Sequence, residues 1–306
     1  MKSAASLPGI STEMTPFRLG LLGAGRMGRT HLAALEASEA VRITAIADPA
    51  PAAIALARPG RTVHGDLDGL LAQRLDGVLI AVPSVLHGEA IARIAAAGLP
   101  ILCEKPCGVT ADEARAHAAI ASAAGIKLQV AYWRRFVPGL QDLHARIAAG
   151  ALGDILHIAC HQWDAAPPSA AFRAGSGGIF VDMGVHEFDQ IRWLTGQEIS
   201  SIHTVRARFA PEESAQSLAG LSGGASALIS LGQHFRLGDV CRVEVFGTRD
   251  AAEARFLWPP DADAAFHDAL RRQAEAFAAW VGGGPARGAS AEDAVAALAA
   301  AEWAGI

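Results

Sequence analysis

A glycine-rich turn between a short apolar run and a helical segment constrains the fold of this chain more than any other feature. Residues 19–22 (LGLL) lead directly into Gly23-Ala24-Gly25-Arg26-Met27-Gly28, a GxGxxG sequence. The first glycine permits a tight turn, the second lets a pyrophosphate approach the backbone, and the third lets the following helix pack against the strand. The free N–H groups of a helix that starts near Arg26 favour a phosphate at this turn.

Asp48 indicates which dinucleotide would bind there. It follows Gly28 by twenty residues and closes the next apolar run. A carboxylate at this place in a βαβ unit accepts hydrogen bonds from the adenosine ribose and repels a 2′-phosphate. Arg58 and Arg61 lie too far along the chain for the usual phosphate clamp. The sequence therefore predicts an NAD site, with NADP disfavoured, rather than a Gly-rich packing turn with a surface aspartate.

Apolar runs alternate with segments of helical spacing through the first half of the chain. The runs suit strands buried on both faces, as in a parallel sheet covered by helices. We therefore expect an α/β domain with a doubly wound parallel sheet. The expected strands are 18–22, 41–47, 77–82, 100–103 and 126–131, and the expected helices are 26–37, 84–97 and 111–124.

The pattern changes near residue 133, where longer β-like segments follow one another without intervening helices. This is typical of an α+β domain with an open, mostly antiparallel sheet. We expect strands at 155–163, 199–209, 225–235 and 242–246, and helices from 138 to about 150 and at 182–194, 266–281 and 290–303. The predicted division is a flexible extension (1–15), an NAD-binding Rossmann domain (16–135) and a substrate-binding and oligomerisation domain (136–306).

Composition excludes several classes of protein. Hydrophobic residues make up 51% of the 306 residues, which excludes a disordered chain. The net charge of −5 argues against a nucleic-acid surface. No apolar run approaches the roughly 20 residues needed to cross a bilayer. Four cysteines are too few for a disulfide framework, so we expect a cytoplasmic protein, with Cys103 and Cys107 as small buried residues rather than a redox pair.

Three polar residues have the chemistry of a dehydrogenase site. Lys105 follows the strand at 100–103, and the carboxyl edge of a parallel sheet is where ligands bind. Its ammonium group could stabilise an alkoxide, although an exposed lysine at a turn is as consistent with the position. Asp182 and His186 share one helical face at i and i+4. Histidine can accept a hydroxyl proton. The alternative is an ordinary helix, and the absence of a suitable third ligand argues against a metal site.

Tyr132, Trp133 and Arg134 follow the strand at 126–131. Aromatic faces and a guanidinium group suit the wall of a polyol pocket. Core packing and a surface arginine explain the same residues equally well.

Five segments carry a specific combination of motifs: GLLGAGRMGRTHL (20–32), AVPSVLHGEA (81–90), CEKP (103–106), AYWRRF (131–136) and SGGIFVDMGVHEFDQIRWLTG (176–196). Together they resemble the Gfo/Idh/MocA oxidoreductase family over nearly the whole chain. The resemblance implies a catalytic set of Lys105, Asp182 and His186. It also implies that Ser84 and His87 line the nicotinamide side, that Glu104 lies near the cofactor, and that Arg134 lies near the substrate.

Among members of that family, the chain looks most like inositol 2-dehydrogenases and sugar dehydrogenases. The expected reaction is NAD-dependent oxidation of a secondary alcohol of a cyclitol or sugar. The resemblance further implies a homodimer or homotetramer built through the second sheet. An aldose 1-dehydrogenase or a sugar ketone reductase is the alternative, followed by an NAD-dependent glycosidase or an NAD-binding regulator. The loop 164–177 does not closely match the inositol enzymes, so the particular substrate stays open.

Overall fold

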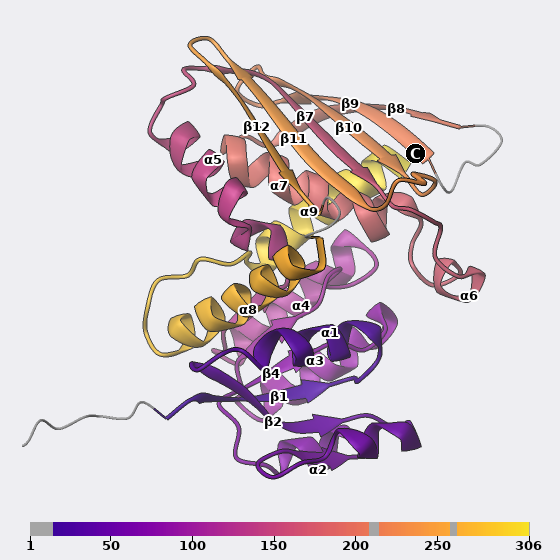
Figure 1. The fold of residues 1–306 in the computed structure, drawn as a ribbon, viewed down its shortest axis with the longest axis vertical. Helices are drawn as coiled ribbons and strands as arrows, with labels where there is room; N and C mark the ends of the chain where they lie inside the picture. The colour runs from indigo at the N-terminus through magenta and orange to yellow at the C-terminus, as the bar shows by residue number, and fades with distance from the viewer. Residues whose placement is uncertain (1–14, 208–213, 258–261, 306) are drawn as a thin grey trace, which may run out of the picture.

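Two six-stranded sheets, one from each half of the chain, organise the structure (Figure 1). The computed structural model describes residues 15–207, 214–257 and 262–305. The expected flexible extension, apart from residue 15, and the last two residues of the strand expected at 199–209 lie outside these ranges. None of the helices in these ranges is long and apolar enough to cross a membrane.

The first sheet is entirely parallel, with the strand order β3-β2-β1-β4-β5-β6. This order reverses between β1 and β4, and dinucleotides bind at such a reversal in doubly wound sheets. The predicted α/β class is therefore confirmed. The strands are β1 (Phe17–Leu22), β2 (Val41–Ala47), β3 (Thr62–His64), β4 (Gly77–Ile80), β5 (Ile101–Cys103) and β6 (Leu128–Val130).

Helices cover both faces of this sheet, which explains why its strands are so apolar. Every residue of β5 is fully buried, as are Val78, Leu79 and Ile80 of β4. The short strand β3 was not expected, because three residues with one apolar side chain form no apolar run. The helical segments are α1 (Arg26–Leu35), η1 (Pro51–Leu56), α2 (Leu67–Leu71), η2 (Ser84–Leu86), α3 (His87–Ala96) and α4 (Ala111–Ala123).

The second sheet is mixed and mostly antiparallel, with the order β12-β11-β7-β10-β9-β8. Only β7 and β10 run parallel to each other among its described strands, so the predicted α+β architecture is confirmed. The strands β9 and β12 were missed because small and charged residues interrupt their apolar alternation. The bounds are β7 (Ile155–Trp163), β8 (Ile199–Arg206), β9 (Ser214–Leu221), β10 (Ser226–Gly232), β11 (Val240–Gly247) and β12 (Ala251–Phe256).

Helices lie along one face of the second sheet, and the ribbon leaves its other face uncovered by described elements (Figure 1). The segments of this half are η3 (Trp133–Phe136), α5 (Pro138–Ala148), α6 (Ala170–Arg173), η4 (Phe180–Gly184), α7 (Val185–Thr195), α8 (Ala262–Val281) and α9 (Ala291–Gly305). Here η4 is a single π-helical turn that continues directly into α7.

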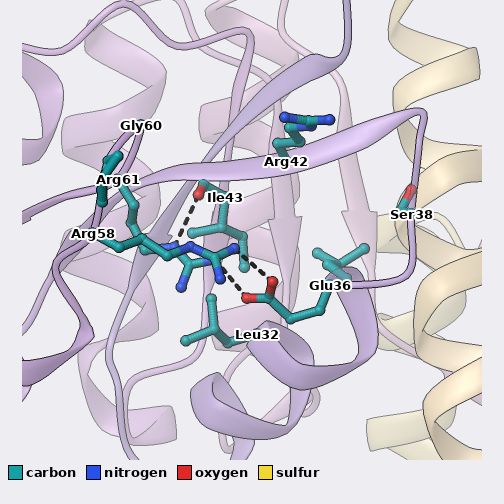
Figure 2. Close-up of a pocket in the computed structure, with 10 residues that line it drawn as sticks. Leu32, Glu36, Ser38, Arg42, Ile43, Arg58, Gly60 and Arg61 are labelled. Atoms are coloured by element: carbon teal, nitrogen blue, oxygen red, sulfur yellow. Dashed lines mark hydrogen bonds and ion pairs between the residues drawn. The ribbon is translucent and has the colours of Figure 1, made fainter.

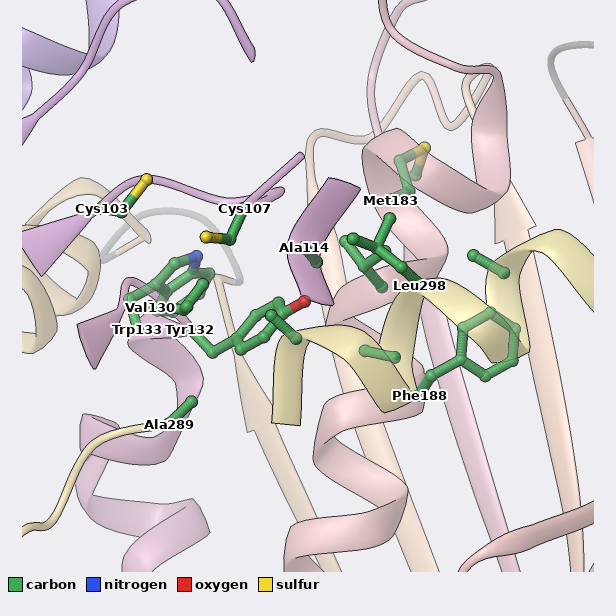
Figure 3. Packing of buried hydrophobic residues seen from close by; sticks show 14 of the residues in the cluster. Cys103, Cys107, Ala114, Val130, Tyr132, Trp133, Met183, Phe188, Ala289 and Leu298 are labelled. Atoms are coloured by element: carbon green, nitrogen blue, oxygen red, sulfur yellow. The ribbon is translucent and has the colours of Figure 1, made fainter. Parts of the chain in front are cut away.

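The last two helices join the halves. α8 packs against α1 of the first half, and α9 packs against both α4 and α7. Figure 3 shows part of the resulting core, with Trp133 beside Val130 and Cys107, and with Leu298 and Phe188 farther along α9. Side chains from both halves thus share one hydrophobic core, next to the loop that follows β5.

Candidate active site

Lys105 and Asp182, which are 77 residues apart in the sequence, meet between the two sheets. Lys105 lies just beyond β5, and its peptide bond to Pro106 is cis. Its Nζ donates to the backbone carbonyl oxygen of Asp182 at 2.6 Å and to Asp182 Oδ1 at 3.2 Å. An ammonium group has three N–H donors, so one remains beyond these two bonds. The fold therefore holds a cation with a donor to spare at the carboxyl edge of the first sheet.

His186 lies one turn beyond Asp182, in the first turn of α7, and is buried. The rings of Tyr132 and Trp133 meet the imidazole edge to face, with centroids 5.9 Å and 6.1 Å away. Burial, reinforced by the positive charges of Lys105 and Arg134, holds the pKa of His186 well below 6.5. The imidazole is therefore neutral at pH 7 and able to accept a proton.

The glycine loop has the space that a pyrophosphate needs. A Cβ on Gly28 would lie 2.0 Å from the carbonyl oxygen of Gly23, so this close packing requires glycine. Gly23 itself has a φ of 95°, which favours glycine. A Cβ on Gly25 would meet nothing within 4 Å, and Gly25 caps α1 without a side-chain hydrogen bond. The open side of Gly25 and the free N–H groups of α1 therefore fit a phosphate group.

Asp48 lies beside this loop. Its Oδ2 accepts a hydrogen bond from the N–H of Ala24 at 2.6 Å, and its Oδ1 accepts one from the N–H of Ala50 at 2.8 Å. Both bonds fix the carboxylate at the end of β2, where its remaining lone pairs can accept ribose hydroxyls.

Comparisons with known proteins agree with this geometry. Residues 17–132 match the model of an oxidoreductase family with an NAD-binding Rossmann fold, and residues 140–253 match the Gfo/Idh/MocA C-terminal domain. The rhizopine catabolism protein MocA of Rhizobium meliloti is 53% identical over 298 residues, which cover 94% of each chain. The chain belongs to the Gfo/Idh/MocA family. The family resemblance seen in the sequence is confirmed, and so is the prediction of an NAD-binding oxidoreductase.

Two further relatives of this Gfo/Idh/MocA protein act on inositol by name. The inositol 2-dehydrogenase of Rhizobium meliloti (strain 1021) is 32% identical over 83% of this chain and 80% of its own. The crystal structure of a myo-inositol dehydrogenase from Corynebacterium glutamicum ATCC 13032 superposes with a TM-score of 0.84 at 26% identity, covering 95% of this chain and 96% of that one.

Three residues expected near the cofactor of this Gfo/Idh/MocA protein take distinct positions. Ser84 starts η2 just after β4 and is half-buried. The buried ring of His87 lies 2.9 Å from the carbonyl oxygens of both Val82 and Pro106, so it ties the loop after β4 to the loop after β5. Glu104 is buried against His31 of α1. Contact of these residues with the cofactor stays a prediction.

Tyr132, Trp133 and Arg134 lie behind His186, and all three are buried. The Arg134 guanidinium donates to Glu187 at 2.6 Å and to Gln162 at 2.5 Å. Their expected contact with substrate stays a prediction. Trp133 packs in the core and Arg134 pairs with Glu187, whereas the buried hydroxyl of Tyr132 has no hydrogen-bond partner among the described residues.

The sequence interpretation missed Asp164, whose carboxyl group lies near that of Asp182. Gln162 Nε2 donates to Asp164 Oδ1 at 3.2 Å, and burial raises the pKa of Asp164 to about 6. Asp164 starts the loop 164–177, which the sequence interpretation singled out as unlike the inositol enzymes. The same loop borders a cavity of about 40 Å³ beside Asp182, lined by Pro168, Arg173, Ser176, Gly178, Ile179, Asp182 and Gln233. The sequence did offer one signal for Asp164: an acidic residue directly after the long strand β7, at the start of a loop that the sequence interpretation had singled out.

A larger cavity, of about 290 Å³, lies at the C-terminal end of α1, opposite the end that starts at the glycine loop (Figure 2). Arg58 and Arg61 line it, and both bind the carboxylate of Glu36, at 2.5 Å and 2.7 Å. Their charges are thus shared with Glu36 beyond the C-terminal end of α1, away from the glycine loop at its N-terminal end. This arrangement agrees with the prediction that neither arginine clamps a 2′-phosphate.

Proposed function

We propose that this Gfo/Idh/MocA protein oxidises a secondary alcohol of a cyclitol or sugar, with NAD as hydride acceptor. The observation that carries the proposal is the meeting of Lys105, Asp182 and His186 beside the carboxyl edge of the first sheet. The names of the inositol dehydrogenase relatives support the choice of a polyol substrate.

Each of the three side chains has a distinct task in this reaction. NAD, when bound, would supply the hydride acceptor for the carbon that bears the hydroxyl group. His186 is neutral and takes the hydroxyl proton on a ring nitrogen, as a general base. Lys105 directs its remaining N–H at the oxygen as negative charge develops there. Asp182 holds the ammonium group in place and has lone pairs left for a neighbouring substrate hydroxyl.

The cofactor half of the proposal rests on the glycine loop and Asp48. Gly23, Gly25 and Gly28, with the backbone of Arg26 and Met27 at the start of α1, would hold the pyrophosphate. Asp48 would accept the adenosine ribose hydroxyls, and its charge would exclude a 2′-phosphate.

A substrate screen tests the proposal directly. Purified protein is incubated with inositols, common sugars and their glycosides, each with NAD, and NADH is followed by absorbance. We expect NADH formation with at least one cyclitol or sugar. Hydrolysis of a glycoside without net NADH would instead identify a glycosidase. Tight NAD binding with no turnover of any of these compounds would identify a regulator, and either result would contradict the proposal.

We further propose that the open face of the second sheet forms a homodimer or homotetramer. Gln190 of α7 contacts Cys160, which marks the covered face, and strand alternation places Val205, Leu218 and Phe246 on the other. These three side chains are 61%, 56% and 44% exposed, and exposed apolar patches usually mark interfaces. Light scattering should give two or four times the mass of one chain, and Leu218→Glu should reduce it. The mass of one chain for the wild type would contradict this assembly.

A further inference from the structure

A buried pair between His31 and Glu104 links the nucleotide helix to the lysine loop. His31 lies on α1, three residues beyond Gly28, and its side chain is fully buried. Glu104 lies between β5 and Lys105, with 7% of its side chain exposed. The distance from His31 Nε2 to Glu104 Oε1 is 2.6 Å. Neither residue has a part in the reaction proposed above.

The second oxygen of Glu104 extends this contact to Lys105. Glu104 Oε2 accepts a hydrogen bond from the backbone N–H of Lys105 at 3.1 Å. The backbone N–H of Glu104 donates to the carbonyl oxygen of Ile80 in β4, so the carboxylate projects from a fixed point of the sheet. A continuous set of bonds therefore runs from α1 through Glu104 to the backbone of Lys105, whose Nζ reaches Asp182.

The bonding of His31 indicates which way its proton points. Its Nδ1 is buried with no hydrogen-bond partner among the described residues. A proton on Nδ1 would be left buried and unpaired, whereas a proton on Nε2 meets the Glu104 oxygen. The Nε2–H tautomer therefore lets His31 donate to Glu104. A buried carboxylate needs such donors, and His31 and the Lys105 backbone supply one to each oxygen.

We propose that His31 is a positioning residue for Lys105, acting through Glu104. By holding one carboxylate oxygen, it orients the other toward the Lys105 backbone and so sets where the ammonium group lies relative to Asp182. Because the same helix starts at the glycine loop, the pair also fixes the distance between the pyrophosphate site and Lys105. The expected effect of His31 on turnover rests on the function proposed above, whereas its effect on the position of Lys105 does not.

The chain offers a direct readout of the position of Lys105, because its only lysines are Lys2, Lys105 and Lys127. Cleavage after arginine places Lys105 in the peptide 94–115 and Lys127 in 116–134. Pulsed acetylation with acetic anhydride, followed by mass spectrometry, then reports the accessibility of each amine separately. Lys127 donates to the carbonyl oxygen of Trp280 and serves as the internal control.

His31→Leu removes the donor and keeps an apolar side chain, whereas His31→Gln keeps an amide N–H in place of Nε2–H. We expect His31→Leu to raise the acetylation rate of Lys105 about tenfold, the change expected when one hydrogen bond to a buried charged group is lost. Lys127 should be unchanged, and His31→Gln should restore the wild-type rate. With a substrate from the screen, His31→Leu should have a lower kcat, because Lys105 is no longer held in position. The Kd for NAD should change less than kcat.

Equal acetylation of Lys105 in wild type and His31→Leu, with matching circular dichroism, would overturn the proposal even if the protein proves to have another activity. A rise at Lys105 and Lys127 alike would also overturn it, because the change would then be general loosening. Should His31→Leu fail to fold, Glu104→Gln provides the second variant. Its amide can satisfy only one of the two donors, so Lys105 acetylation should rise there too, and an unchanged rate would again contradict the role.

Discussion

The ammonium nitrogen of Lys105 lies 2.6 Å from the backbone carbonyl oxygen of Asp182 and is thereby fixed to the segment that precedes His186. A backbone acceptor cannot be lost by side-chain rotation, so the cation stays in place while the Asp182 carboxylate is free to accept another partner. The same charge helps to keep His186 unprotonated. One contact between the sheets therefore positions the Lys105 ammonium group and helps to keep His186 able to accept a proton.

Replacing Lys105 by Met should remove the charge and leave the cofactor site intact. We expect kcat to fall about 10²–10³-fold, the effect of removing one donor aimed at a developing oxyanion. NAD affinity, measured by fluorescence titration, should change little, because the glycine loop and Asp48 are untouched. Lys127→Met is the matched control and should keep wild-type kcat. A Lys105→Met enzyme with near-normal kcat would exclude the alkoxide role.

Loss of His186 should abolish the general base. His186→Ala is expected to lower kcat about 10²–10⁴-fold. In the wild type, burial and Lys105 keep the imidazole neutral well below pH 6.5, so oxidation should not decline as pH falls from 7.5 to 6.5. Steady-state rates across this range check both points. A rate that halves near pH 6.5 would show a proton acceptor with an unshifted pKa.

Asp48 should determine the choice of cofactor. Its carboxylate would face a 2′-phosphate at close range, and such like-charge contacts cost several kcal/mol. The wild type should therefore have a kcat/KM for NAD that greatly exceeds that for NADP. Asp48→Ser combined with Ala50→Arg should reduce this ratio by at least about tenfold. Faster wild-type turnover with NADP at equal concentration would show that the carboxylate does not lie against the ribose.

Asp164 should make stability depend on pH in a predictable direction. Its pKa is raised from 3.8 to about 6, so the folded state holds the proton more tightly than the unfolded state. The stabilisation is complete below pH 3.8 and is lost as pH rises through about 6. Between pH 5 and 7.5 the loss is about one pKa unit, or about 1.4 kcal/mol. Asp164→Asn removes this titration, so urea unfolding should show the variant gaining about that amount on the wild type between the two pH values. If the free energies of unfolding of variant and wild type differ by the same amount at pH 5 and pH 7.5, the raised pKa of Asp164 is contradicted.

Arg134 should matter for folding as much as for substrate. Arg134→Met leaves the Glu187 carboxylate buried without its guanidinium partner, which typically costs about 3–5 kcal/mol. The double variant Arg134→Met/Glu187→Gln should recover a large part of that free energy of unfolding, because no charge then remains unpaired. Urea unfolding of the single and double variants measures the difference. If the single variant is fully stable but has a raised KM, the arginine serves the substrate alone.

The sequence predicted the parts of the site whose chemistry is local. The glycine loop is a contiguous segment, and two of its glycines have backbone reasons within it: Gly23 has a positive φ, and a Cβ on Gly28 would meet the carbonyl oxygen of Gly23. Lys105 and Asp182 came together only through the family resemblance, because no periodicity relates residues 77 positions apart.

Buried polar residues were the part that sequence could not reveal. His31 and Asp164 have the residue types of an exposed helix face and of a loop, whereas the packing of distant elements buries His31 fully and Asp164 in part. Arg134 illustrates the same limit, because the sequence singled it out but did not reveal its buried partner. Its motif predicted a substrate contact, and the structure adds an ion pair with Glu187 that follows from the neighbouring helix rather than from the motif. Strand β3 was missed for the simpler reason that only one of its three residues, Val63, is apolar.

The packing of α8 against α1 has a consequence for synthesis on the ribosome. Phe17, at the first position of β1, meets the ring of Phe277 edge to face at 6.0 Å, and Ser38 donates to Glu275. Phe277 is fully buried, so the surface it covers stays open to water until residue 277 has been translated. A nascent chain that stalls before residue 262 would expose this apolar surface to chaperones. The first sheet to emerge is thus completed only after the strands of the second sheet have been synthesised.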